Sequence, residues 1–307
     1  MKKIFSLLIL TFLNLFSFAN SISDTSLIKK HLTALTKSFG NRDYGNVATL
    51  NITADYIKSE FEKYADSTAV QMYDVQGQKS KYKNIICSFG IQNKKRIIVG
   101  AHYDVCEIQQ GADDNATGVV GLLELARLLK GQKLNYRIDL VAYSLEEPPY
   151  FRTNEMGSYI HAKYLSDNKI SVKGMICLEM IGYFKDEKHS QHYPLGLLKM
   201  FYGSKGNYIT LVKKFGAGNF TRKFVRTYKR TNALKTKIFS GPKWLPGIDF
   251  SDHLNYWKFG YSAFMITDTS FYRNPNYHEK SDTVETLDIS RMAKVIDGVF
   301  QSILNLK

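Results

Sequence analysis

Two pairs of residues that could carry hydrolytic chemistry stand directly after apolar runs of the chain. One pair is His102 and Asp104, and the other is Glu146 and Glu147. A histidine that leaves a strand can bind zinc while a nearby carboxylate orients its ring. Adjacent glutamates at a strand end can point in different directions, so that one binds a metal and the other faces water. A structural His–Asp pair and two exposed glutamates are the alternatives.

Three further segments add potential metal ligands. Segment 111–118, GADDNATG, frames two aspartates and an asparagine with small residues at the predicted start of a helix. Acidic residues cap helix N-termini, but the small residues also allow close approach of a cation, and one carboxylate could bridge two metal ions. Glu179 interrupts an apolar strand, where an acid is costly unless it is paired or bound. His278 follows, with Asp282 four residues later. Two histidines and several acids at strand ends together favour a metal site.

The apolar pattern predicts an alternation of strands and helices. The predicted strands are 70–75, 82–89, 96–101, 136–145, 172–180 and 261–266, and the predicted helices are 27–39, 47–64, 119–129, 158–165 and 289–306. This alternation is typical of an α/β domain with helices on both faces of its sheet. Stretch 185–247 shows no clear element and is expected to pack beside the site. Residues 20–307 are therefore predicted to form a single catalytic domain.

The N-terminal residues have the layout of a secretory signal peptide. Lys2 and Lys3 precede the uncharged apolar run 4–18, and small residues stand before a cleavage position after Ala19. An uncleaved membrane anchor is the alternative, but the run is short for a full span. We therefore predict a signal peptide over 1–19, a secreted or periplasmic mature protein, and no stable membrane insertion after cleavage.

The net charge and the cysteines say less about the function than the motifs do, but they bear on binding partners and disulfide bonds. The formal net charge of +14 falls to +12 when Lys2 and Lys3 leave with the signal peptide, and part of the basic excess lies in 222–237. An exported protein rarely meets nucleic acid, so we expect no nucleic-acid partner and a solvated basic face open to anionic surfaces. The three cysteines, Cys87, Cys106 and Cys177, allow at most one bridge. Their pairing and the oligomeric state stay open.

In order and spacing, several motifs resemble one family. AHYD, GADDNATG, a strand ending in EE, LEMIGY, SDH and NPNYHEKSDT are similar to motifs of zinc metallopeptidase family 28, the family of bacterial leucyl aminopeptidases. Glutamate carboxypeptidase and the glutaminyl cyclases are its more distant relatives. The resemblance runs from His102 to the C-terminal helix. It implies a three-layer α/β/α sandwich of the phosphorylase/hydrolase type, with a mixed, mostly parallel central sheet and two zinc ions per chain.

Carried over position by position, the resemblance also implies a ligand set. His102 and Glu179 would hold one zinc ion, and Glu147 and His278 would hold the other. Asp114, the fourth residue of the glycine-framed motif, would bridge the two ions. The implied protein is a metallo-aminopeptidase that hydrolyses N-terminal residues from peptides.

The resemblance assigns supporting roles to other residues. Glu146 would be the general base acting on a water molecule between the ions, and Asp104 and Asp282 would orient ligands. The motif SDH places Asp252 and His253 near the site, without a ligand role.

Two departures from the family pattern and two alternative functions accompany this interpretation. Position 179 is Glu where many members have Asp, and a rigid segment, 148–150, follows the glutamate pair and is expected to shape the pocket wall. A glutaminyl-cyclase-like acyltransferase with one zinc ion is one alternative. A non-catalytic ectodomain on the same fold is the other, although such a protein should have lost ligands.

Overall fold

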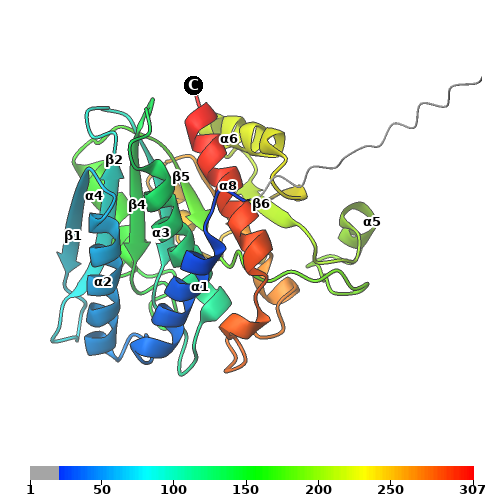
Figure 1. Ribbon diagram of the computed structural model, residues 1–307, viewed down its shortest axis with the longest axis horizontal. Helices are drawn as coiled ribbons and strands as arrows, with labels where there is room; N and C mark the ends of the chain where they lie inside the picture. The colour runs from blue at the N-terminus through cyan, green and yellow to red at the C-terminus, as the bar shows by residue number, and fades with distance from the viewer. Residues whose placement is uncertain (1–20) are drawn as a thin grey trace, which may run out of the picture.

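The computed structural model describes residues 21–307, and one eight-stranded sheet runs through it (Figure 1). The strand order is β1-β2-β4-β3-β5-β8-β6-β7. The strands are β1 Ser67–Tyr73, β2 Tyr82–Phe89, β3 Arg96–His102, β4 Arg137–Tyr143, β5 Val172–Leu178, β6 Ile209–Lys214, β7 Thr236–Gly241 and β8 Ala263–Thr267. The neighbouring strands β4, β3, β5 and β8 are parallel, whereas β1–β2, β2–β4 and β6–β8 pair antiparallel. The predicted mixed, mostly parallel sheet is confirmed.

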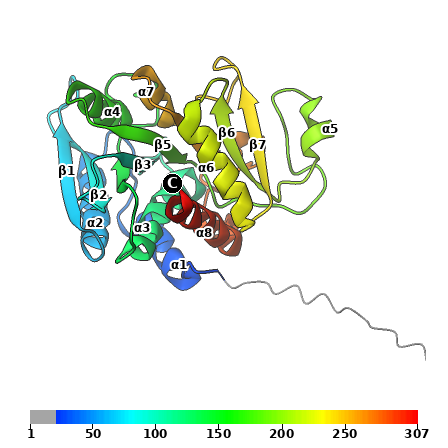
Figure 2. The same cartoon turned by 90° about the horizontal axis from the view of Figure 1, so that it is seen from above.

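Helices cover both faces of this sheet. The α-helices of the described residues are α1 Thr25–Thr33, α2 Val47–Glu62, α3 Gly118–Leu129, α4 Gly157–Asp167, α5 Leu198–Tyr202, α6 Gly218–Thr231, α7 His253–Lys258 and α8 Ile289–Asn305, and all but α5 lie over the faces of the sheet. Figure 2 shows α4 and α7 on one face, and α1, α2, α3, α6 and α8 on the other. The three-layer α/β/α arrangement predicted from the sequence is therefore present.

The apolar strands explain why both faces are covered. In β3 and β4 every residue after the first is buried. Val99 and Leu140 belong to the large cluster that includes α3 and α8, while Ile98 and Val141 belong to a second cluster with α4 and α7. Successive side chains of a strand point to opposite faces, so each of these strands contributes to both cores. The result is a rigid central sheet whose strand ends can hold functional groups.

The prediction that 185–247 is irregular was wrong. This stretch contains α5, β6, α6 and β7, and its two strands extend the sheet beyond β8. Lysines such as Lys213, Lys214 and Lys237 break the apolar pattern in these strands. β7 lies at the edge of the sheet and its residues are mostly only half-buried. An edge strand needs less apolar sequence, so hydrophobic periodicity did not reveal it.

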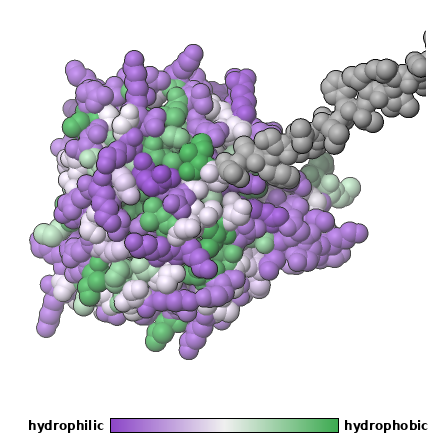
Figure 3. All heavy atoms as spheres, viewed as in Figure 1, coloured by the Kyte–Doolittle hydropathy of each residue, from purple (hydrophilic) through white to green (hydrophobic). Residues whose placement is uncertain are grey.

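The basic residues of α6 point to solvent. Arg222, Lys223, Arg226, Lys229 and Arg230 are exposed, whereas the apolar side of the same helix packs in the core. Figure 3 shows polar side chains over much of one face of the molecule, with scattered apolar ones between them. The predicted solvated basic face is therefore present on α6.

Within residues 21–307, no helix combines the length and the apolar character needed to cross a bilayer. The predicted signal peptide, with its cleavage position after Ala19, lies outside the described residues.

Candidate active site

Neighbouring parallel strands place the predicted site residues at one edge of the sheet. His102 is the last residue of β3, Glu179 comes directly after β5, and Glu146 and Glu147 follow the end of β4. Because β4, β3 and β5 are adjacent, these four side chains start from one edge. The helices α3 and α4 that connect them lie on opposite faces of the sheet. In α/β folds such a change of face places the ligand site at the carboxyl ends of the strands.

Asp114 lies at the centre of the cluster. Its Oδ1 is 3.4 Å from His102 Nε2, and its Oδ2 is 3.2 Å from His278 Nε2. His102 Nε2 is also 3.4 Å from Glu179 Oε2, and His278 Nε2 is 3.2 Å from Glu147 Oε2. The structure thus brings together all five predicted metal-binding residues. They form two His–Glu pairs, and each pair faces a different oxygen of Asp114.

The chemistry of these groups fits divalent metal ions. His102 Nε2, His278 Nε2 and Glu147 Oε1 are buried atoms without a hydrogen-bond partner. Buried polar atoms normally have a hydrogen-bond partner, so three atoms without one need an explanation. Two nitrogen or oxygen donors, each about 2.0–2.1 Å from a tetrahedral zinc ion, lie about 3.3 Å apart. The separations of 3.2–3.4 Å across each pair match that value.

Asp104 connects His102 to the glutamate pair. Its Oδ1 and Oδ2 accept hydrogen bonds from the backbone N–H groups of Glu146 (3.2 Å) and Glu147 (3.0 Å). The Nδ1 atom of His102 lies 3.2 Å from the carbonyl oxygen of Asp104 and 3.5 Å from its Oδ1. Asp104 is fully buried. It therefore fixes the turn after β4 and the ring at the end of β3 at the same time.

Two other carboxylates are also held by buried donors. Asp282 accepts the backbone N–H groups of Asp113 and Asp114, with its Oδ2 3.0 Å from Asp114 N. Glu179 Oε2 accepts a hydrogen bond from Ser251 Oγ at 2.6 Å and one from Asn115 Nδ2 at 3.2 Å. Asp282 therefore supports the backbone of the central aspartate, and its role in orienting a metal ligand stays a prediction. Ser251 belongs to the SDH motif, but the sequence did not indicate its contact with Glu179.

Glycines let the segment of Asp114 fit between β3 and β5. Gly111 has φ +54°, and a Cβ there would collide with Val105 and with the carbonyl oxygen of Asp114. At Gly118, which begins α3, a Cβ would lie 2.6 Å from the carbonyl oxygen of Leu178 at the end of β5. Residues larger than glycine at these positions would push the motif away from the sheet.

Burial and neighbouring charges shift the pKa values of the site. Burial raises the pKa of Glu147 to about 7, and the charge of Asp114 adds to this effect. Burial also raises the pKa of Glu146 well above its ordinary value, although His102 opposes the shift. For His278, burial lowers the pKa, but the carboxylates of Asp114 and Glu147, each 3.2 Å from Nε2, outweigh this effect and raise the pKa to about 10. A carboxylate with a raised pKa is a better base near neutral pH.

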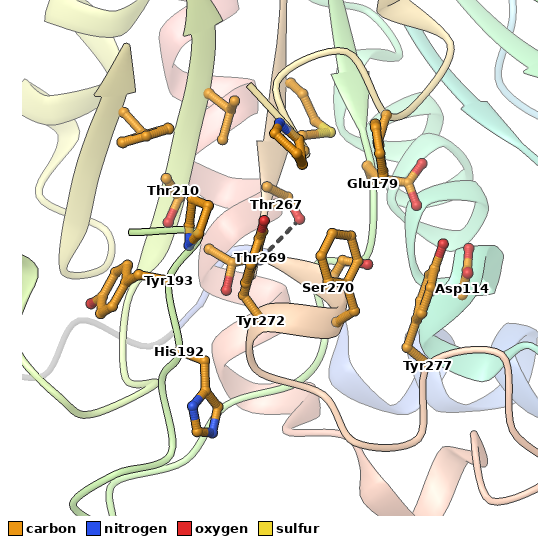
Figure 4. Close-up of a pocket in the computed structure, with 18 of the residues that line it drawn as sticks. Asp114, Glu179, His192, Tyr193, Thr210, Thr267, Thr269, Ser270, Tyr272 and Tyr277 are labelled. Atoms are coloured by element: carbon orange, nitrogen blue, oxygen red, sulfur yellow. Dashed lines mark hydrogen bonds between the residues drawn. The ribbon is translucent and has the colours of Figure 1, made fainter. Parts of the chain in front are cut away.

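A cavity of about 250 Å³ opens beside the cluster. Figure 4 shows Asp114 and Glu179 at one end and Tyr193 and Thr210 at the other. Much of the wall is apolar or aromatic and includes Pro148, Phe151, Tyr208, Val212, Phe239, Phe250, Met265, Phe271, Tyr272 and Tyr277. Pro148 belongs to the rigid segment 148–150, which was expected to shape the pocket wall, and it does line the cavity. The other residues come from separate segments, including 185–247, and no motif in the sequence groups them.

The remaining singled-out residues lie outside the paired cluster. Asp252 is fully buried, and burial raises its pKa to about 7. His253 Nε2 contacts the carbonyl oxygen of Ile248 at 2.8 Å, which is a structural role. The three cysteines form no disulfide, but Cys106 lies beside Glu147 and His278.

The chain matches known proteins over most of its length. The model of peptidase family M28 matches residues 84–303. Over 288 residues the chain is 41% identical to the uncharacterized protein YfbL of Escherichia coli (strain K12), covering 91% of this chain and 88% of that protein. A probable leucine aminopeptidase of Arthroderma otae is 27% identical over 290 residues, covering 88% of this chain and 70% of that protein.

Solved structures share the fold at lower identity. The LapA aminopeptidase of Legionella pneumophila superposes with a TM-score of 0.71 at 20% identity, covering 92% of this chain and 71% of that one. A glutaminyl cyclase of Fimbriiglobus ruber superposes with a TM-score of 0.68 at 18% identity, covering 94% and 98%. At such identity the likeness concerns the fold alone. The family match and the 41% identical relative carry the assignment, and this chain belongs to peptidase family M28.

Proposed function

We propose that this M28 peptidase is a two-zinc aminopeptidase, which removes N-terminal residues from peptides. The observation that carries the proposal is the position of Asp114 between two His–Glu pairs. A carboxylate that offers one oxygen to each pair is the arrangement a bridging ligand needs. The leucine aminopeptidase names of several relatives support the choice of activity.

Each ligand has a defined place in this proposal. His102 and Glu179 would hold one zinc ion, Glu147 and His278 the other, and Asp114 both. Bound zinc polarises a carbonyl group and lowers the pKa of water, which is the chemistry that peptide hydrolysis requires.

Glu146 is the proposed general base. It belongs to neither His–Glu pair, and it lines the cavity. Its Oε2 lies 3.8 Å from His102 Nε2. Asp104 holds its backbone, which supports the position of the residue beside the pairs and the cavity. There Glu146 would take a proton from the attacking water and deliver it to the leaving nitrogen.

The cavity defines where the substrate would bind. Its carboxylate end lies at the proposed reacting centre, and its apolar wall suits an apolar side chain next to the scissile bond. We also propose that the protein is exported, since Lys2 and Lys3 and the apolar run 4–18 have the layout of a signal peptide.

The test combines zinc analysis with hydrolysis of aminoacyl-p-nitroanilides by the purified mature protein. We expect about two zinc ions per chain, as in co-catalytic sites. Glu146→Gln should keep the zinc and lower kcat by about 10²–10⁴-fold, because only the proton transfer is lost. Glu187→Gln, at an exposed position, is the matched control and should behave as wild type. The mass of the mature chain reports whether residues 1–19 have been removed.

Other results would change the conclusion. One zinc ion per chain, with cyclisation of N-terminal glutaminyl peptides and no hydrolysis, would indicate a cyclase. A protein without tightly bound metal would rule out the proposed reaction.

A further inference from the structure

Cys106 lies against one half of the candidate metal site. Its Sγ, one carboxylate oxygen of Glu147 and one ring nitrogen of His278 all lie within 4.8 Å of one another. Nothing in the family motif accounts for a thiol at this position. The other two cysteines, Cys87 and Cys177, are buried on β2 and β5.

The loop that carries Cys106 is fixed by several hydrogen bonds. Gln109 Nε2 donates to the carbonyl oxygen of Cys106 at 2.7 Å, and the N–H of Val105 donates to the carbonyl oxygen of Arg42 at 3.2 Å. The buried guanidinium of Arg42 donates to the carbonyl oxygens of Tyr103 and Gly111, on either side of the loop. The backbone around Cys106 is therefore held by several hydrogen bonds.

The partners of Cys106 have unused ligand capacity. Glu147 is only 3% exposed and its Oε1 has no hydrogen-bond partner, while Oε2 faces His278. His278 Nε2 also lacks a hydrogen-bond partner. Glu147 and His278 thus each have an unsatisfied ligand atom, and one ligand atom of each converges with the thiol. This is typical of a cation site, because zinc accepts Cys, His and Glu together.

We propose that Cys106 is an additional protein ligand of the zinc ion that Glu147 and His278 hold with Asp114. The inference rests on the proposed function, since it requires zinc at that position. On binding, the thiol gives up its proton to solvent and a sulfur lone pair forms the bond to zinc.

A Cys106 thiolate would leave the side of the zinc ion that faces the cavity free. Glu147 and His278 line the cavity, whereas Cys106 is not among the described residues that do. The sulfur would therefore approach the ion from outside the cavity, so substrate and water keep their access. The two metal positions then differ chemically, because only one has a soft sulfur ligand. Such a ligand favours zinc over hard cations such as Mg²⁺.

The test is zinc K-edge X-ray absorption on the full mature protein loaded with two zinc ions. Zn–S contacts at about 2.3 Å are resolved from Zn–N and Zn–O contacts at about 2.0–2.1 Å. We expect an average of about half a sulfur per zinc in the wild type, since one of two ions has one thiolate. Cys106→Ser should abolish this shell and weaken the binding of one zinc ion about tenfold or more.

Cys87→Ala removes a core thiol and should keep the sulfur shell. Bound zinc without a sulfur shell in the wild type would overturn the role of Cys106 and leave the proposed function intact. A sulfur shell that persists in Cys106→Ser would also overturn it. A wild-type protein that binds no zinc would overturn both proposals.

Discussion

A buried carboxylate, Asp104, links residues from two strands at the candidate site. It accepts the N–H groups of Glu146 and Glu147 and lies beside the ring of His102. Groups that orient ligands in this way control metal affinity although they do not touch the ion.

We predict that Asp104→Asn lowers zinc affinity about 10–100-fold, because an amide offers only one acceptor to the two N–H groups. Competition against a chromophoric chelator measures the change. Asp55→Asn is the control, since Asp55 is exposed and pairs only with Lys83 at the surface. Equal zinc affinity in the two variants would show that Asp104 does not orient the ligands.

At the scale of elements, the start of α3 depends on close contact with the end of β5. Gly118 allows this contact, because a Cβ would lie 2.6 Å from the carbonyl oxygen of Leu178 and would collide with Asn115 Oδ1. The same contact positions Asn115, whose Nδ2 donates to Leu178 O and to Glu179 Oε2.

Gly118→Ala should therefore destabilise the protein by about 1–3 kcal/mol, the usual cost of overpacking. Urea denaturation of the metal-free protein measures the change. Gly196→Ala is the matched control, because a Cβ there meets nothing within 4 Å. Identical unfolding midpoints for the two variants would mean that the backbone shifts at no cost.

At the scale of the whole molecule, buried acids make stability depend on pH and metal. In the metal-free protein, burial raises the pKa of Asp268 to about 6, of Glu147 to about 7 and of Asp282 to about 8. An acid whose pKa is raised in the folded state contributes its full stabilisation at a pH below its pKa in the unfolded state. The contribution is lost as pH rises to the pKa of the folded state. Zinc binding has the opposite dependence, because it needs ionised carboxylates and neutral histidines.

We therefore expect these acids to lower the Tm of the metal-free protein as pH rises from about 4, the ordinary carboxyl pKa, to about 8, the highest of the three raised values. The increase in Tm on adding zinc should grow over the same range. Scanning calorimetry with and without zinc tests both. A zinc-induced increase that shrinks toward pH 8 would contradict the expected ionisation of the ligands.

The sequence by itself predicted the alternation of strands and helices around a sheet covered on both faces, and its resemblance to the family predicted the mostly parallel order and the identities of the clustered residues. Strands such as β3 and β4 are buried on both faces, so their apolar runs are nearly continuous and easily recognised. Polar residues that directly follow such runs, such as His102 and Glu147, must lie at one edge of the sheet. That reasoning applies to local sequence and needs no knowledge of distant contacts.

Only the tertiary structure decided the rest. In β6 the apolar residues stop at Val212 and two lysines follow, whereas the edge strand β7 is mostly half-buried, so neither shows a clear period, and their position depends on β8. The cavity wall combines residues such as Phe151, Tyr208 and Phe271 from separate segments. The two oxygens of Asp114 face histidines that are remote in the sequence. The thiol of Cys106 lies beside Glu147, which is on a different loop. Such distances depend on how the strands and loops pack, and they cannot be read from residue types and their spacing along the chain.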